Sequence, residues 1–283
     1  MSKLLRKILL PATAIYFICA YQLVLADDNA ASHVETAQKY LSEKNYKGAI
    51  GEFSAALSFT MDDKYKSKIV NAIGWAYYSI GESESAMQHL QQAYELASRA
   101  GERNVMIRAL NNMGLVEFSR GHFAEARKYF EDDLVATGDT AKRYLPLIVE
   151  QENLKKANDY ISTGVVYRLN KMFTKSIGEF DKALSLVPDN ANALEYKGYA
   201  LYRLGKYDES IATLNRAYEL DSSDINISIN LLKAYCGKKE PKKSIEFIKS
   251  STVSADDKKA LLNDGELKRV CGPEVMDQIL ALE

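Results

Sequence analysis

Residues 173–189 read FTKSIGEFDKALSLVPD, and the same pattern returns at residues 207–223 as YDESIATLNRAYELDSS. Upstream of the two stretches, Gly164 and Gly198 are separated by the same interval as Phe173 and Tyr207. This interval falls within the period of about 20–50 residues that is typical of repeat proteins, in which one supersecondary unit recurs along the chain. The fold is therefore decided by a short repeated unit rather than by one globular core.

Each unit predicts two helices that carry bulky and small residues at helical spacing. In the unit that begins at Ala157, the first helix has Tyr167 beside the small Gly164, and the second has Phe180 beside Ala183. Small residues let two helix axes approach to roughly 8–10 Å, while the rings fill the space beside the contact. One face of each helix pair stays uncovered, so neighbouring pairs must stack into a solenoid.

This pattern resembles the tetratricopeptide repeat family, which has Gly or Ala at unit position 8, Tyr at 11, aromatic residues at 17 and 24, Ala at 20 and 27, and Pro at 32. The unit from Ala157 matches most of these positions, including Ala183 and Pro188, and departs from them with Thr163 and Ser176. The resemblance implies an all-α fold, a right-handed α-solenoid of about six helix-turn-helix units with C-terminal capping helices.

Six units follow from the residue at position 20, which is Ala49, Ala86, Ala126, Ser176, Ser210 and Ser244 in turn. The last two intervals equal the offset between the two quoted stretches, and the first two are slightly longer. The interval from Ala126 to Ser176 is the longest, so it holds an insert, in which Pro146 suits an early helix position. We predict repeat units 1–3 over residues 30–140, an inserted or extended helix over 141–156, units 4–6 over 157–258, and capping helices over 259–283.

The first 26 residues have a different composition from the repeats. Basic residues between positions 3 and 7 precede an apolar-rich stretch at 8–25, and Val24-Leu25-Ala26 fits the positions that a signal peptidase reads. We predict a signal peptide over residues 1–26 and an exported, periplasmic protein. The alternative is a membrane anchor formed by uncleaved residues 8–25, since 18 residues are close to the length that spans a bilayer.

Charge and motifs exclude several classes of function. Without residues 1–26 the chain has 34 Lys and Arg against 38 Asp and Glu, which argues against nucleic acid or a membrane surface as the main partner. The histidines, His33, His89 and His122, fall in separate repeats without other ligands at metal-binding spacing. The sequence has no HExxH, GxSxG or Gly-rich phosphate loop. We therefore predict no catalytic residue, no metal, no cofactor and no enzymatic activity.

Cys236 and Cys271 are the two cysteines outside the predicted signal peptide. In an oxidising compartment, an even pair is a candidate disulfide. The alternative is that both are small buried side chains that never meet. The pair is therefore a possible disulfide that would close a loop of about 35 residues around the last repeat.

The resemblance also implies a concave groove, lined by the first helix of each unit. The peptide-binding residues predicted there are Lys68, Asn71, Trp75, Arg108, Asn111, Asn112, Tyr196 and Tyr199. Trp75 and Tyr199 are expected to be exposed rings. Exposed rings beside amides suit an extended peptide, because rings supply contact area at low entropy cost and Asn pairs with both backbone groups.

These expectations combine into one functional prediction. The chain is predicted to be an exported, non-catalytic interaction module that binds a protein or peptide segment in its groove and serves cell-envelope assembly. The clamp by which some family members hold a chaperone's terminal carboxylate is matched only in fragments, so that ligand is not predicted. The alternative is a structural subunit whose repeats stack on copies of itself or within a larger envelope complex.

Overall fold

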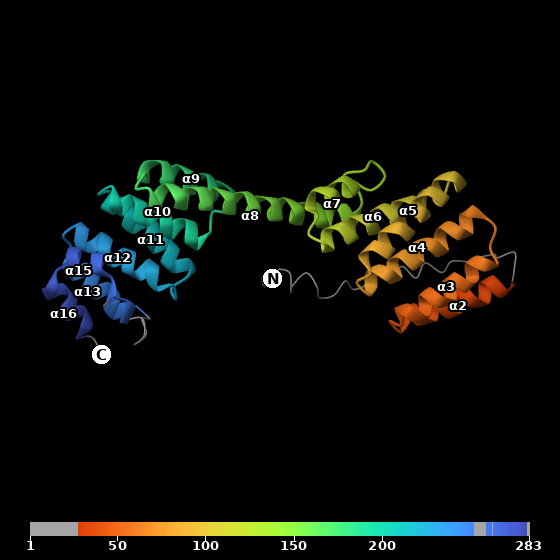
Figure 1. Ribbon diagram of the computed structural model, residues 1–283, viewed down its shortest axis with the longest axis horizontal. Coiled ribbons are helices and arrows are strands. Elements are labelled where there is room, and N and C mark those ends of the chain that lie inside the picture. Colours follow the sequence, from red (N-terminus) through yellow and green to blue (C-terminus); the bar gives the residue numbers. More distant parts are fainter. Residues whose placement is uncertain (1–27, 252–258, 262, 282–283) are drawn as a thin grey trace. The chain divides into compact units, whose positions relative to one another are not determined.

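The computed structural model describes residues 28–251, 259–261 and 263–281. Within these ranges the chain is all-α and contains no β-strand, as the repeat pattern predicted (Figure 1). None of the described helices has both the length and the apolar composition needed to cross a membrane. The predicted signal peptide lies outside the described residues.

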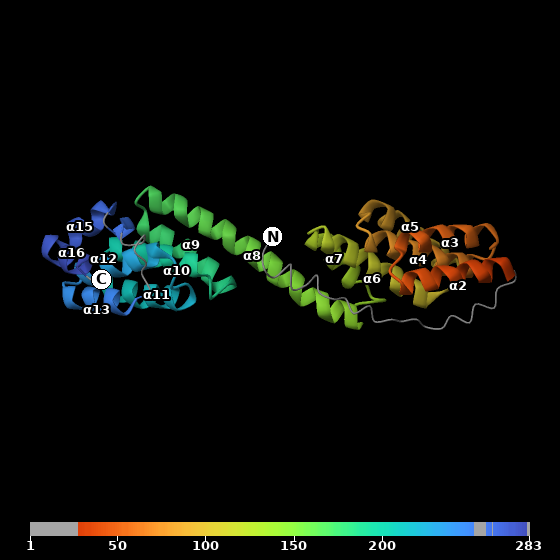
Figure 2. The same ribbon diagram turned by 90° about the horizontal axis from the view of Figure 1, so that it is seen from below.

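The chain forms two compact bodies, one ending at Ile148 and the other beginning at Val149. We call them the amino-terminal and carboxy-terminal bodies. The amino-terminal body contains α2 (Asp28–Ser42), α3 (Tyr46–Ser58), α4 (Asp63–Ser79), α5 (Ser83–Ala100), α6 (Arg103–Ser119), α7 (Phe123–Phe130) and the start of α8 (Asp139–Leu169). Consecutive helices pack against each other from α2 to α7 (Figure 2).

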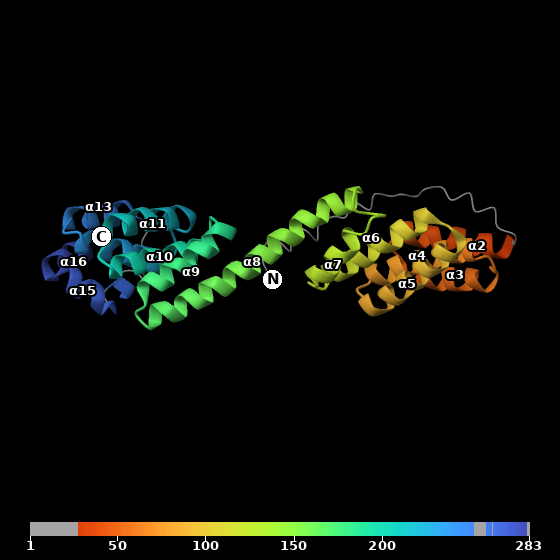
Figure 3. The same ribbon diagram turned by 90° about the horizontal axis from the view of Figure 1, so that it is seen from above.

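The carboxy-terminal body contains the remainder of α8 and seven further named helices. These are α9 (Phe173–Leu186), α10 (Ala191–Arg203), α11 (Tyr207–Leu220), α12 (Ile225–Gly237), α13 (Pro241–Ser250), α15 (Gly265–Cys271) and α16 (Pro273–Leu280) (Figure 3). Helices α9, α10, α11 and α12 also pack in chain order.

Helix α8 contains both the predicted insert and the first helix of the fourth repeat. It begins at Asp139, so Pro146 lies inside the helix and not in its first turn. The expectation of an early helix position for Pro146 is therefore wrong, because the helix starts well before it. Pro146 lacks an N–H and cannot bond the carbonyl of Lys142, which leaves that turn of α8 without one backbone hydrogen bond.

Each helix pair turns at the same unit position, where the backbone takes a left-handed conformation with φ between 59° and 86°. The six residues are Lys44, Gly81, Gly121, Lys171, Gly205 and Lys239. Their spacing along the chain repeats the intervals between the position-20 residues. The turn geometry therefore recurs in all six units, even where lysine occupies a conformation that favours glycine.

The small residue at position 8 brings the two helices of a pair into close contact. A Cβ placed on Gly164 would lie 2.5 Å from Cε1 of Phe180, and one on Gly114 would lie 2.6 Å from Cε1 of Phe130. Both phenylalanines are fully buried. The combination of small residue and ring predicted from the sequence is thus the contact that joins the two helices of a repeat.

Serine at position 20 explains one departure from the family pattern. The Ser176 hydroxyl donates a hydrogen bond of 2.9 Å to the carbonyl of Gly164, and the Ser210 hydroxyl donates one of 2.7 Å to that of Gly198. Both serines are fully buried. Burying a hydroxyl that makes a hydrogen bond costs little free energy compared with burying one that makes none. Serine can therefore replace alanine here, because its hydroxyl has a hydrogen-bond partner.

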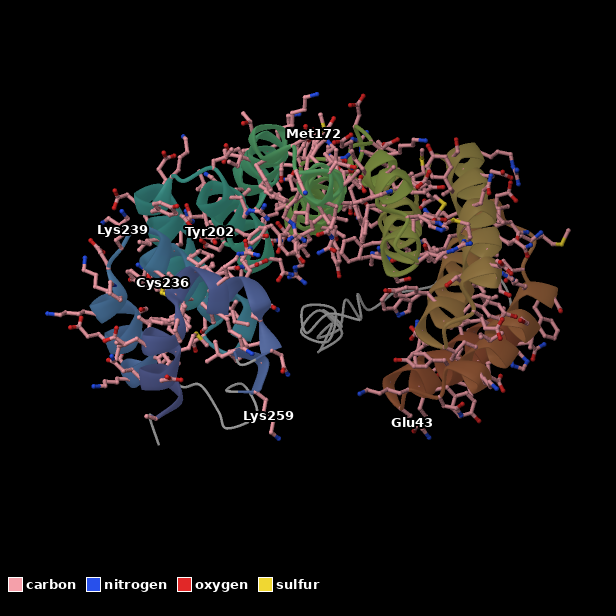
Figure 4. All side chains as sticks on the ribbon, turned by 60° about the vertical axis from the view of Figure 1, so that its left-hand side comes forward. Glu43, Met172, Tyr202, Cys236, Lys239 and Lys259 are labelled. Atoms are coloured by element: carbon pink, nitrogen blue, oxygen red, sulfur yellow. A yellow bond between two sulfur atoms is a disulfide. The ribbon has the colours of Figure 1, made fainter. Side chains whose placement is uncertain are left out.

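The last two helices cover the end of the carboxy-terminal body. Leu267 of α15 and Met276 of α16 are buried in one cluster with Leu232 of α12. A disulfide joins Cys236 of α12 to Cys271 of α15, with Cα atoms 4.9 Å apart (Figure 4). The α15 segment is therefore attached to α12 by both apolar packing and a covalent bond.

Candidate functional site

The predicted groove residues fall on two separate surfaces, one in each body. Six of the eight lie on α4 and α6, which are the first helices of neighbouring repeats and pack against each other. We call this surface the amino-terminal wall; its residues are Lys68, Asn71, Trp75, Arg108, Asn111 and Asn112. Tyr196 and Tyr199 lie on α10 and belong to a second surface, described below.

Asparagine amides form the centre of the amino-terminal wall. Nδ2 of Asn112 on α6 donates a hydrogen bond of 3.4 Å to Oδ1 of Asn71 on α4. The neighbouring Asn111 is half-buried, and its Oδ1 is a buried atom that accepts no hydrogen bond within the described part of the chain. An amide pair therefore spans two repeats at the centre of the wall, and the side-chain carbonyl of Asn111 is buried beside it.

The ring of Trp75 is half-buried rather than exposed, and so is that of Tyr199. Trp75 packs against Tyr78 on the next turn of α4, with ring centroids 5.2 Å apart. Residues three positions apart are neighbours on a helix surface, so Tyr78 covers part of the indole. The expectation of fully exposed rings is wrong for this reason, although Trp75 keeps accessible area on the wall.

Cations lie at the end of the wall where α6 begins. Nζ of Lys68 is 3.9 Å from Oε2 of Glu102 and lies over the Tyr65 ring, and Nζ of Lys64 is 3.0 Å from Oε1 of the same carboxylate. Glu102 precedes the first turn of α6, where a negative charge is favoured by the helix dipole. Arg108 follows on α6 and is half-buried.

The second surface, which we call the carboxy-terminal wall, is built around Tyr196 and Tyr199. The guanidinium of Arg168 on α8 lies over both rings, at 5.2 Å from the centroid of Tyr196 and 5.4 Å from that of Tyr199. The Tyr199 hydroxyl accepts a hydrogen bond of 2.7 Å from Nη1 of Arg203 and donates one of 3.3 Å to Oε2 of Glu266. Tyr199 is thus held by three charged side chains.

A buried lysine connects this wall to α15. Lys233 on α12 is 5 % exposed, and its Nζ lies 2.8 Å from Oδ2 of Asp264 and 3.3 Å from Oε2 of Glu266. Asp264 also caps α15 by accepting a hydrogen bond from the backbone N–H of Leu267. A buried charge is tolerated when it is paired and hydrogen-bonded, as this ammonium is.

Glu195 is the buried acid of the carboxy-terminal wall. It is 6 % exposed and accepts a hydrogen bond from Nδ2 of Asn230. Burial raises the pKa of Glu195 to about 7; the positive charge of Arg168 opposes the rise, and the negative charge of Asp224 adds to it. The carboxyl therefore changes charge near neutral pH, unlike an ordinary glutamate.

We expect Glu195→Gln to remove a pH dependence of stability. The pKa of Glu195 is about 7 in the folded chain, against a reference value of 4.5. Between these two pH values the folded state binds more protons than the unfolded state, so the free energy of unfolding falls as pH rises. At pH 8 the variant should be more stable than wild type by about 3 kcal/mol. Urea unfolding at pH 4.5 and 8 measures this, and an equal effect at both values would contradict it.

Sequence reasoning missed the charged and polar residues that surround the tyrosines of the carboxy-terminal wall, namely Arg168, Glu195, Asn230, Lys233 and Glu266. One signal was available, because Arg168 occupies the unit position that the aromatic Tyr202 has in the next repeat. The carboxylate of Glu266 had no such signal, since it belongs to the capping segment outside the repeat pattern.

Three segments of the chain match models of the tetratricopeptide repeat family. They cover residues 67–99, 106–136 and 166–225. The first two contain most of α4 to α7, and the third contains the end of α8 and all of α9 to α11. The matches thus fall in both bodies and coincide with helix pairs.

Curated relatives match only locally. Cellulose synthase operon protein C of Komagataeibacter xylinus is 31 % identical over 83 residues, which are 29 % of this chain and 6 % of that protein. Superkiller protein 3 of Schizosaccharomyces pombe is 26 % identical over 189 residues, which are 65 % of this chain and 12 % of that protein. The chain therefore spans a small fraction of the length of these relatives.

Solved structures with a similar arrangement include the TPR2AB-domain:pHSP90 complex of yeast Sti1, with a TM-score of 0.45 and 17 % identity over 89 % of this chain and 98 % of that chain. YrrB, described as a TPR protein with an unusual peptide-binding site, has a TM-score of 0.33 and 19 % identity over 76 % and 94 % of the two chains. With its repeated helix pairs and its three matched segments, this chain belongs to the tetratricopeptide repeat family.

Proposed function

We propose that this protein is a non-catalytic protein–protein interaction module that holds an extended segment of a partner protein on the amino-terminal wall. The observation that carries the proposal is the hydrogen bond of 3.4 Å between Asn112 and Asn71, which joins the first helices of two neighbouring repeats. Trp75 lies one turn of α4 beyond Asn71, so an aromatic ring flanks this amide pair. The side-chain amide of asparagine has both a donor and an acceptor, as does the backbone of an extended segment.

The neighbouring side chains suit the same ligand. The side-chain amides of Asn71 and Asn112 are hydrogen-bonded to each other across α4 and α6. Each amide can make further hydrogen bonds as a donor and as an acceptor. Trp75 offers an aromatic surface next to these amides, with Lys68 and Arg108 on the same wall. Tyr196 and Tyr199 give the carboxy-terminal wall a comparable aromatic surface. Rings beside amides recognise backbone and apolar side chains together.

We further propose that the protein is exported to the periplasm and serves assembly of the cell envelope. The disulfide between Cys236 and Cys271 supports an oxidising compartment, because cytosolic proteins keep their thiols reduced. The proposed signal peptide over residues 1–26 gives a route to that compartment. The local similarity to a cellulose synthase operon protein supports the same proposal.

Substitution of Trp75 tests the peptide site. Eight-residue peptides selected from a random library on the oxidised chain should bind with micromolar affinity, about 8 kcal/mol. Trp75→Ala should weaken them at least tenfold, because a central aromatic residue commonly contributes about 2 kcal/mol at such surfaces. Asn71→Ala should weaken the same peptides by removing the amide that pairs with Asn112. Fluorescence anisotropy measures each affinity.

Gln88→Ala supplies the matched control, since Gln88 is exposed on α5, outside the wall. This variant should bind the selected peptides as wild type does. Peptides that bind Trp75→Ala and Asn71→Ala with unchanged affinity would refute the amino-terminal wall as the site. A mass that rises with concentration in light scattering, without peptide binding, would instead favour the structural subunit.

A further inference from the structure

The turns between the two helices of each repeat form one edge of the carboxy-terminal body. The guanidinium of Arg203, where α10 ends, lies over the Phe173 ring at the start of α9, with Cζ 4.8 Å from the centroid. Nζ of Lys238, just after α12, lies 2.7 Å from Oδ1 of Asp208 at the start of α11. These contacts place three successive turns side by side. We call this surface the turn edge; its segments are residues 169–175, 203–209 and 237–243.

Large apolar side chains are exposed on the turn edge. Leu169 is 71 % exposed, Met172 is 42 % exposed and Leu204 is 41 % exposed. Leu169 and Met172 lie on either side of the left-handed residue of one turn, and Leu204 precedes that of the next turn. Exposed apolar side chains that gather on adjacent turns, unlike those scattered singly over a surface, mark a contact site.

The charge of the turn edge is opposite to that of the whole chain. Its three segments contain eight Lys and Arg against three Asp and Glu, whereas the chain has a net charge of -1. Each of the three carboxylates is paired with a lysine of the same edge, and Arg203 is paired with Glu266 of α15. The remaining lysines of the edge are all exposed, and they are Lys171, Lys175, Lys239 and Lys242.

Two of these lysines have a backbone conformation that favours glycine. The φ angle is 59° at Lys171 and 65° at Lys239, and Gly205 has the same turn position in the repeat between them. A residue with a Cβ is less stable in this conformation than glycine is. The geometry of the turn therefore does not require lysine at either position.

The matching segments of the amino-terminal body lack both properties of the turn edge. They are residues 42–48, 79–85 and 119–125, and they contain three Lys and Arg against four Asp and Glu. None of the large hydrophobic side chains that are exposed in the described chain lies in them. Lys44 has the same left-handed conformation as Lys171, so charge and exposed apolar area, not conformation, distinguish the two bodies.

We propose that the turn edge of the carboxy-terminal body binds the surface of a membrane that contains anionic lipids. Leu169, Met172 and Leu204 would enter the boundary between headgroups and acyl chains, and the exposed lysines would lie against the anionic headgroups. An acidic protein would match the lysines alone, whereas a lipid surface matches both the charge and the apolar side chains. The net charge of the chain does not oppose this contact, because charges farther than about 10 Å from the surface are screened by salt.

A tryptophan placed on the turn edge tests where the full, oxidised chain touches lipid. Trp75→Phe removes the single native tryptophan, and Leu169→Trp adds one on the edge. With phosphatidylcholine vesicles that contain about 30 % phosphatidylglycerol, its emission should move to shorter wavelength and be quenched by brominated lipid. Ser119→Trp in the same background is the matched control, since Ser119 is exposed at the same unit position in the amino-terminal body. It should show neither change.

The double variant Lys171→Gly with Lys239→Gly tests the charge. Glycine suits both turns, so the variant should fold as wild type does. Its partition onto the same vesicles, measured by co-sedimentation, should weaken by about tenfold or more, because each lysine near an anionic surface contributes about fivefold. Lys44→Gly makes the same change of turn residue in the amino-terminal body and should bind as wild type does. All variants keep residues 1–26, so that segment contributes equally to each comparison.

Four results would overturn the membrane contact. The first three are equal partition of the double variant and Lys44→Gly, equal partition of wild type onto vesicles of phosphatidylcholine alone, and no change in Leu169→Trp emission while the chain is bound to vesicles. The fourth is binding of soluble polyglutamate to the wild-type chain, weakened in the double variant, without quenching of Leu169→Trp by brominated lipid. That result would identify an acidic protein as the partner of the turn edge. The peptide site on the amino-terminal wall is judged separately by Trp75→Ala.

Discussion

Phe180→Ala is expected to lower the free energy of unfolding of the carboxy-terminal body by about 3–5 kcal/mol. The side chain is fully buried, and its ring fills the space beside Gly164 and packs against Tyr196 with centroids 5.8 Å apart. It therefore joins α8, α9 and α10 at once. Truncation of the Phe180 side chain leaves a cavity between these helices. The cavity stays open because closing it would require two repeats to move.

Phe130→Ala is the matched substitution in the amino-terminal body, where Phe130 fills the space beside Gly114. Trp75 is the single tryptophan of the chain and lies in that body, so its fluorescence reports unfolding there, while far-UV circular dichroism reports both bodies. Phe130→Ala should shift the fluorescence transition in urea more than Phe180→Ala does. A loss below about 1 kcal/mol for Phe180→Ala would show that the ring does not join the repeats.

Replacing Cys236 and Cys271 by serine should cost roughly 3–4 kcal/mol, the value that chain entropy assigns to a cross-linked loop of about 35 residues. The effect should concentrate on α15, because the disulfide ties that helix to α12 at a sequence separation of 35. Hydrogen exchange should accelerate most in α15 and α16. The pairing of Lys233 with Asp264 and Glu266 would then depend on apolar packing alone.

Reduction of the wild-type chain with dithiothreitol provides the control for this substitution. It should produce the same loss of stability and the same pattern of exchange as the double serine variant. The variant itself should not respond to the reductant. Equal urea midpoints for oxidised and reduced chain would mean that α15 is held without the covalent bond.

How far the site was predictable depends on whether a residue belongs to the repeat. Asn71 and Asn112 were placed on one surface from their unit positions, and their hydrogen bond joins α4 and α6. Exposure of Trp75 was not predictable from unit position, because Tyr78 on the next turn covers part of its ring. The position of a residue in the repeat unit defines the helix face on which it lies. The accessible area of its side chain depends on how neighbouring large side chains pack against it.

The sequence by itself determined the all-α class, the two-helix unit and the number of repeats. These properties follow from local periodicity, since Gly164 and Phe180 lie within one unit and the same types recur at fixed offsets. Only the tertiary structure decided that α15 returns to α12 and places Glu266 beside Tyr199, 67 residues away in the chain. The repeat pattern does not predict this contact, because Glu266 belongs to a capping segment outside the repeats. The contact depends on the path of that segment and on the buried charges with which its carboxylates pair.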